Sequence, residues 1–303
     1  MKRGMNRKAL RELVGRHAGP DRASETPIDG LRLFRIDEPI ERLPGVYPAS
    51  MCCIVQGTKR AYLGGVAHTY DEDHYLCATM ALPVEAEVPF ATPDEPVLGL
   101  LVDLDTRAMA ETLIAYETAA RPRRTPSAKE VTPGLIVAQV DERFVDAVGR
   151  LLQLLDDPVG LRVLADSRLR ELLFTLIEGQ AGPLVRQTLG GAHDISQVVA
   201  YLRDNLCEPL TVDDLAKRAG MSRAVFHRRF KTATSLSPLQ FIKALRLNQA
   251  AMQIAGGMAV SHAADSVGYT SASQFSREFR RQFGASPKRW ARTAAFAPDV
   301  QAS

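Results

Sequence analysis

Two stretches near the end of the chain repeat one pattern at a spacing of 49 residues. The first, FHRRFKTATSLSPLQF, covers residues 226–241, and the second, FSREFRRQFGASPKRW, covers residues 275–290. Similarity at a fixed spacing indicates that one structural unit is used twice. Phenylalanines four residues apart share one helical face, and the arginines beside them form a cationic edge. A helix of this kind suits a DNA groove, so the repeat predicts two DNA-contacting helices.

Charge is distributed unevenly along the sequence. Residues 193–303 contain 15 Lys/Arg and 8 Asp/Glu, a net of +7, whereas residues 1–192 contain 23 and 27, a net of −4. A positive region beside a slightly negative one is typical of proteins that bind the phosphate backbone. The partner predicted for the basic region is double-stranded DNA.

Length and composition indicate a globular protein with more than one domain. The chain has 303 residues, of which 46% are hydrophobic, enough for two domains with proper cores. No apolar run is long enough to span a membrane, and the N-terminus lacks the apolar segment of a signal peptide. We therefore expect a cytoplasmic protein with no membrane partner, whose four cysteines are thiols.

The first 105 residues divide into an arm and a β domain. Residues 1–30 read as an amphipathic helix over 5–17 followed by a turn-rich arm. Residues 31–105 consist of short apolar runs broken by Pro and Gly at intervals of about ten residues, a texture typical of an antiparallel sandwich or barrel. A small barrel can hold one small ligand, so this segment is the predicted sensing domain.

Residues 106–178 read as a helical region. A helix over 106–120 and a polar connection over 121–134 precede two leucine-rich helical patterns, which must be buried on the barrel, on each other or across a dimer. We expect a homodimer that uses this region. Residues 179–193 include four glycines and a proline, which predicts a linker.

Residues 194–295 predict an all-helical domain with two helix-turn-helix units. In the first unit a helix over 212–219 ends at Gly220, and Ser222 caps the next helix. A helix over 260–267, Gly268 and a cap at Thr270 or Ser271 repeat this order. The connecting helix over 238–255 is about 27 Å long at 1.5 Å per residue. It could hold the two recognition helices about one DNA turn, roughly 34 Å, apart. Residues 296–303 form a tail. The predicted fold class is α+β: a small N-terminal cupin-like β-barrel with flanking helices, and this C-terminal all-α domain.

The C-terminal motifs resemble those of the AraC/XylS family of transcription regulators. The resemblance rests on A-x-x-A-G-M-S-x-x-x-F-x-R-x-F-K from residue 216, on SP-x-x-F from residue 237, on A-D-S-V-G-Y from residue 264, and on F-x-R-x-F-R-x-x-F-G-x-SP-x-x-W from residue 275. VQGTK at 55–59, YL at 75–76 and ALPV at 81–84 are similar to the cupin-like sensing domain of one AraC subgroup. The resemblance implies a sequence-specific, effector-responsive, non-enzymatic regulator, often an activator that contacts RNA polymerase.

The same resemblance implies positions that contact DNA. Arginine can make two hydrogen bonds to guanine, so Arg228 and Arg277 are the main candidates for base recognition. The alternatives for both are a phosphate contact or a solvated helix face. The full set of base-reading positions implied by the family is Arg223, Ala224, His227, Arg228, Ala272, Ser273, Ser276 and Arg277, and the phosphate candidates are Arg229, Lys231, Arg280, Arg281, Lys288 and Arg289.

The small-molecule effector is not identified by the sequence, but polar candidates for its pocket are present. Gln56, Lys59 and Tyr75 could line a barrel mouth or be ordinary strand residues. The chain has no H-x-H motif of the metallo-cupin type, so we expect no metal, no cofactor and no catalytic residue. Two alternatives stay open. One is a thiol-based redox or electrophile sensor that uses Cys52, Cys53 or Cys77, and the other is a cupin-type metalloenzyme fused to a DNA-binding domain.

Overall fold

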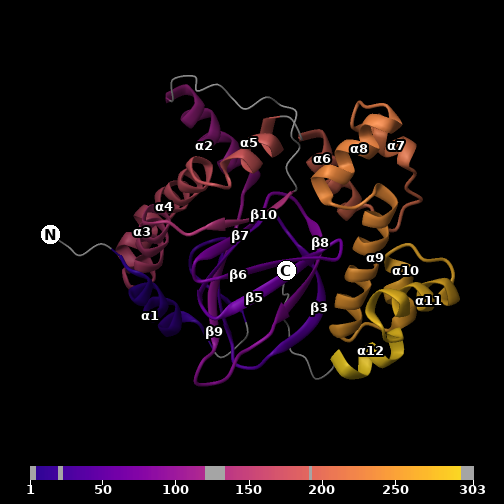
Figure 1. The fold of residues 1–303 in the computed structure, drawn as a ribbon, viewed down its shortest axis with the longest axis horizontal. Helices are drawn as coiled ribbons and strands as arrows, with labels where there is room; N and C mark the ends of the chain where they lie inside the picture. Colours follow the sequence, from indigo (N-terminus) through magenta and orange to yellow (C-terminus); the bar gives the residue numbers. More distant parts are fainter. Residues whose placement is uncertain (1–4, 20–22, 120–133, 191–192, 295–303) are drawn as a thin grey trace.

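The computed structural model describes residues 5–19, 23–119, 134–190 and 193–294. Two antiparallel sheets form the N-terminal domain, and seven helices form the C-terminal part of the described chain. Helices of the N-terminal domain cover one side of the β structure, and the C-terminal helices lie on the opposite side (Figure 1). This arrangement confirms the predicted α+β fold class.

Sheet A has six strands in the order β1-β2-β9-β4-β7-β10, and sheet B has four in the order β3-β8-β5-β6. Apolar side chains from both sheets, such as Ile54 of sheet A and Leu63 of sheet B, share one core, so the sheets pack face to face. The strands are β1 (Ser24–Glu25), β2 (Leu31–Ile36), β3 (Ile40–Tyr47), β4 (Ser50–Gln56), β5 (Thr58–Leu63), β6 (Val66–Asp71), β7 (His74–Ala78), β8 (Leu82–Val88), β9 (Val97–Asp103) and β10 (Leu135–Gln139).

The other face of sheet A is covered by helices. Cys52 and Cys53 are consecutive on β4 and therefore point to opposite faces, one into the core between the sheets and one toward the helices. Leu10, Leu13 and Val14 of the first helix are buried in the helix-facing core, so this helix packs on its own domain. The helices are α1 (Arg7–His17), α2 (Thr106–Ala119), α3 (Glu142–Leu152), a short 3₁₀ helix η1 (Gln153–Asp156), α4 (Pro158–Glu178) and α5 (Gly182–Gly190).

Two predicted boundaries need correction. Residues 179–193, predicted to be a linker, contain α5, because Ala181, Leu184 and Val185 bury their side chains and tie this glycine-rich stretch to the core. Residues 106–178, predicted to be a helical region with a polar connection at 121–134, also contain β10, which pairs with β7 and extends sheet A. The polar connection predicted at 121–134 lies, except for Gly134, outside the described residues, as does the tail.

The C-terminal helices follow the predicted order closely. They are α6 (His193–Asp204), α7 (Val212–Arg218), α8 (Arg223–Thr234), α9 (Pro238–Ala255), α10 (Val260–Ser266), α11 (Ala272–Phe283) and α12 (Pro287–Ala294). Asp194 lies inside the first turn of α6. We call α7 and α8 the first unit, and α10 and α11 the second unit; α9 connects them (Figure 1).

The two units differ in how their cores are built. Phe226 and Phe230 of the first unit belong to a core that is continuous with the one between the two sheets. Phe275 and Phe279 of the second unit pack in a separate core with the second half of α9. The first unit is therefore joined to the N-terminal domain by apolar burial, and the second is built mainly on α9.

Candidate nucleic-acid interface

The first unit presents a recognition helix whose two faces differ in chemistry. Ser222 caps α8 by accepting a hydrogen bond from the Val225 amide. Phe226 and Phe230 are fully buried on one face, and their rings contact each other at 5.3 Å between centroids. His227 and Arg228 are exposed on the other face. Helical periodicity thus separates an anchoring face from a face that is open to a ligand.

The turn before α8 depends on glycine. Gly220 has a φ of 62°, a left-handed conformation that favours glycine, and it follows Ala219, the C-cap residue of α7. The side chain of Arg223, the first residue of α8, pairs with Asp213 of α7 over 3.3 Å. Both groups are well exposed, so this ion pair is weak enough to be exchanged for a DNA phosphate or base.

The second unit repeats this construction. The Ser271 hydroxyl accepts a hydrogen bond from the Gln274 amide and caps α11, and Gly284 ends the helix with a φ of 71°. Phe275 and Phe279 are buried, while Arg277 is exposed on the opposite face. Sequence similarity at a spacing of 49 residues therefore corresponds to structural similarity between the two units.

Polar contacts fix the second unit to α9. The Lys243 ammonium group of α9 pairs with the Glu278 carboxylate of α11 over 2.9 Å, and the Tyr269 hydroxyl donates to the same carboxylate over 2.8 Å. The Trp290 indole donates to the Ala251 carbonyl of α9 over 3.2 Å. Burial tends to raise the pKa of Glu278, but the hydrogen bonds from Lys243 and Tyr269 outweigh it and hold this pKa below its ordinary value.

The predicted DNA-contacting positions lie in the places that the motif implied. The base-reading candidates are all exposed on α8 or α11, and the phosphate candidates are exposed on α8, α11 or α12. The first group is Arg223, Ala224, His227, Arg228, Ala272, Ser273, Ser276 and Arg277, and the second is Arg229, Lys231, Arg280, Arg281, Lys288 and Arg289. Both groups are exposed on α8 and α11, α12 carries only phosphate candidates, and the roles of all these residues stay predictions.

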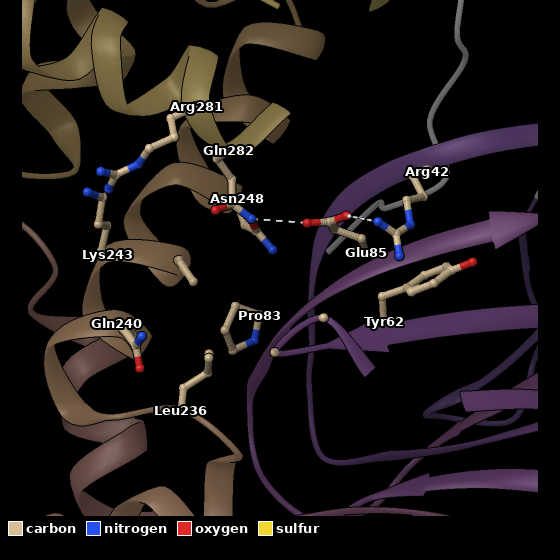
Figure 2. A pocket seen from close by; sticks show the side chains of 13 residues that line it. Arg42, Tyr62, Pro83, Glu85, Leu236, Gln240, Lys243, Asn248, Arg281 and Gln282 are labelled. Atoms are coloured by element: carbon tan, nitrogen blue, oxygen red, sulfur yellow. Dashed lines mark hydrogen bonds and ion pairs between the residues drawn. The ribbon is translucent and has the colours of Figure 1, made fainter. Parts of the chain in front are cut away.

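A junction joins α9 to the outer face of sheet B. The Asn248 side chain of α9 is buried, and its amide nitrogen lies 2.8 Å from the Gly45 carbonyl and 3.4 Å from the Val84 carbonyl. Beside it, Gln282 at the end of α11 donates to Glu85 of β8 over 3.0 Å. These contacts, which we call the junction, hold the helices to the sheet (Figure 2).

The junction encloses a polar cavity of about 440 Å³. Its walls come from sheet B on one side and from α9 and the end of α11 on the other (Figure 2). The cavity includes the phosphate candidate Arg281 as well as Arg42, whose guanidinium group lies 3.4 Å from the centre of the Tyr62 ring. A ligand in this cavity would contact both domains. Sequence reasoning missed the junction, although an asparagine on the apolar face of a predicted helix was a usable signal.

The three predicted effector-pocket residues do not share one space. Lys59 points into the core between the sheets, with its ammonium nitrogen 5.2 Å from the centre of the Phe34 ring. Tyr75 lies in the helix-facing core, where its ring stacks on Phe144 at 4.5 Å. Gln56 donates to the Pro96 carbonyl over 2.7 Å at the end of β4. The common pocket predicted for them is wrong, because alternate strand positions face opposite sides of a sheet.

The cysteines and the possible metal ligands offer little reactive chemistry. Cys52, Cys53 and Cys77 are buried, and burial raises the pKa of each thiol, that of Cys77 to about 12. Such thiols are poor nucleophiles, which disfavours the thiol-sensor alternative. Among the described residues, no three His, Cys, Asp or Glu side chains come together as a metal site. Within the same residues, no helix is long and apolar enough to cross a membrane.

Known proteins are similar to the chain in both sequence and fold. The HTH-type transcriptional activator RhaS of Escherichia fergusonii is 28% identical over 153 residues, half of this chain and 55% of that protein. The chain thus spans about half the length of that relative. The regulatory protein SoxS of Escherichia coli K12 is 33% identical over 31% of this chain and 88% of its own. A crystal structure of ToxT from Vibrio cholerae has the same fold, with a TM-score of 0.55 and 10% identity over 86% of this chain and 97% of that one.

Family models assign both halves. The model for the AraC-type transcriptional regulator N-terminus matches residues 27–184, and a helix-turn-helix domain model matches residues 215–293. The first match includes both sheets except for the two-residue strand β1, and the second includes both recognition helices. The chain therefore belongs to the family of AraC-type transcriptional regulators.

Proposed function

We propose that this protein is a sequence-specific DNA-binding transcription regulator that responds to a small-molecule effector through its N-terminal domain. One observation carries the proposal: two capped helices with exposed arginines are mounted on a single connecting helix of 18 residues. Such a pair can enter successive major grooves on one face of DNA. Double-stranded DNA is the partner that this geometry fits.

The two recognition helices read DNA to different extents. Arg223, His227 and Arg228 of α8 supply long side chains for base contacts, and Arg228 is the principal guanine reader. In α11, Arg277 stands among the small side chains of Ala272 and Ser276. The second unit therefore reads fewer bases directly and relies more on DNA shape. The first unit therefore contributes most of the sequence specificity.

Effector control acts through the packing of the first unit on the two sheets. Because the core of the first unit is continuous with the core between the sheets, a change in the spacing of the sheets is transmitted to α8. The ToxT protein, which shares the fold, has been crystallised in an unsaturated fatty acid-bound form, which supports a small-molecule effector for a chain of this architecture. No observation favours the metalloenzyme alternative, so the proposal includes no enzymatic activity.

We further propose that the protein is a homodimer that contacts RNA polymerase as an activator. Val159 and Val163 are exposed on one face of α4, at 75% and 71% of their surface, and Ile114 of α2 is also exposed. Apolar side chains in such a group suit an interface with a second copy. The name of RhaS, an activator, supports the direction of regulation.

DNA retention by point variants tests the proposed function. The wild-type protein should bind a selected DNA fragment. Its association constant should fall by several orders of magnitude for each tenfold rise in salt concentration. Arg228→Ala and Arg277→Ala should each weaken binding to the selected fragment by about 1 to 3 kcal/mol relative to unrelated DNA. Arg11→Ala on the exposed side of α1 is the control and should bind as the wild type does. Unchanged specificity in both recognition-helix variants would show that the readers are assigned wrongly.

A further inference from the structure

The core between the two sheets contains an unusual group of polar side chains. Lys59 on β5 lies directly opposite Tyr70 on β6, with 9% and 0% of their surfaces exposed. Cys52 of sheet A and Tyr47 at the end of β3 are close enough to affect the pKa of both residues. We call Lys59, Tyr47 and Tyr70 the polar centre of the N-terminal domain.

The Lys59 ammonium group has no anionic partner. Among the described residues, no carboxylate lies within ion-pairing distance of its nitrogen, which lies 5.2 Å from the centre of the Phe34 ring and 5.7 Å from the centre of the Tyr47 ring. Burial opposes the charge, but the neighbouring Tyr47 and Cys52 outweigh burial and raise the pKa of Lys59. A buried charge with no counter-ion is costly to the folded state.

The two tyrosine hydroxyls are also unsatisfied. The oxygens of Tyr47 and Tyr70 are both buried and have no partner with good hydrogen-bond geometry within the described part of the chain, although they lie close enough to Lys59, to Cys52 and to each other for weak hydrogen bonds. Most buried hydroxyls in folded proteins have a partner, so two without one beside an unpaired ammonium group are exceptional. Together the three groups offer hydrogen-bond donors to an anion that is not supplied by the protein.

We propose that the polar centre binds the carboxylate of a small monocarboxylic acid, with the Lys59 ammonium group as its counter-ion and the Tyr47 and Tyr70 hydroxyls as hydrogen-bond donors. One cation and two neutral hydroxyls balance a single negative charge, whereas a dianion such as phosphate would leave one charge uncompensated in the core. The Phe34 ring beside Lys59 provides apolar surface for the remainder of the ligand.

The position of the polar centre fits a role in regulation. Lys59 points inward from β5, and Tyr62 on the same strand lines the cavity at the junction on the outer face of sheet B. A ligand held inside the sheets therefore acts on the strand that also faces α9 (Figure 2). This inference deepens the proposed effector response and rests on it.

Thermal unfolding of the full-length protein tests the site. The probes are sodium acetate, butyrate and hexanoate, each compared with its neutral amide and with sodium chloride at equal ionic strength. At least one carboxylate should raise the Tm of the wild-type protein by about 3 °C more than its amide does, since a ligand that binds only the folded state stabilises it. Lys59→Met should lose this shift, Tyr70→Phe should reduce it, and the exposed control Lys217→Met should retain it.

Two results would overturn the inference: no carboxylate exceeds its amide in the wild-type protein, or Lys59→Met keeps the full shift. If Lys59→Met does not fold, the Tyr70→Phe variant tests the site instead. A carboxylate-induced Tm increase that is as large in Tyr70→Phe as in the wild type would then contradict the site. DNA retention by the wild-type protein is measured on the same preparation. A carboxylate shift without DNA retention would contradict the proposed regulator but not the site, and the reverse result would contradict the site alone.

Discussion

The Asn248 side chain on α9 donates a hydrogen bond to the backbone carbonyl of Gly45 on β3 over 2.8 Å. This bond connects the helix that carries both DNA-contacting units with the sheet that encloses the polar centre. Asn248 is 2% exposed, and its own carbonyl oxygen is buried without a partner. A buried polar side chain at the boundary of two apolar surfaces selects one relative position of the two domains.

Loss of this contact should loosen the junction. Asn248→Ala removes the donor to Gly45 and leaves a small gap, so we expect the free energy of unfolding to fall by about 1 to 2 kcal/mol. Urea unfolding followed by circular dichroism measures the change. Leu239→Ala on the same helix, where the leucine is 64% exposed, is the control and should be nearly neutral. Equal stability of the wild type and Asn248→Ala would mean that the bond does not hold the domains.

Acid should weaken the attachment of the second unit to α9. The pKa of Glu278 is held below its ordinary value of 4.5 in the folded protein, so this residue stabilises the fold above that pH and loses the effect as the pH falls through the lower folded value. Glu278→Gln should lower the free energy of unfolding at pH 7 by about 1 kcal/mol. The difference from the wild type should shrink below pH 4.5. Unfolding curves from pH 3 to 8 measure this difference in the free energy of unfolding. Glu208→Gln, at an exposed position, is the control.

Thiol chemistry should be confined to one cysteine. Cys207 is exposed, whereas Cys52, Cys53 and Cys77 are buried with raised pKa values. With an aromatic disulfide reagent at pH 8, one thiol per native chain should react rapidly, and all four should react after unfolding in guanidinium. Rapid reaction of a second thiol in the native protein would return the thiol-sensor alternative to consideration.

The proposed dimer depends on the exposed valines of α4. Val163→Glu places a charge on the exposed apolar face of α4 beside Val159, so the dimer dissociation constant should rise at least about tenfold. Sedimentation equilibrium over a concentration series measures this constant. Val66→Glu changes another exposed valine, which is on β6, and should leave the constant unchanged. If both variants associate more weakly, or if neither does, this face is excluded as the interface.

Local chemistry made the C-terminal half predictable. Serine caps, prolines at first helical positions and glycines after helix ends act within a few residues, and the structure places α9 at Pro238–Ala255, where the sequence predicts it. The fold class was predictable for the same reason, since short apolar runs and long helical patterns are local signals.

Packing between residues that are distant in the chain could not be predicted from the sequence. The burial that turns 182–190 into a helix comes from residues distant in the chain, and no local pattern shows that β10 pairs with β7. The effector candidates show the same limit. Strand alternation separates Cys52 from Cys53, but which strand faces which layer depends on the pairing of all ten strands. Lys59 was therefore a candidate by sequence, whereas its partners Tyr47 and Tyr70 became visible only in the folded structure.

Selection of bound sequences from a random pool of duplex DNA tests the central claim most directly, because it asks whether the two units read DNA as a pair. We expect the selected duplexes to share two conserved patches with centres about 10 base pairs apart, one major groove for each recognition helix. The patch read by the first unit should be the more strongly conserved, and Arg228→Ala should relax it while leaving the other intact. Failure to enrich any sequence, or enrichment of a single patch that Arg228→Ala does not alter, would contradict the account.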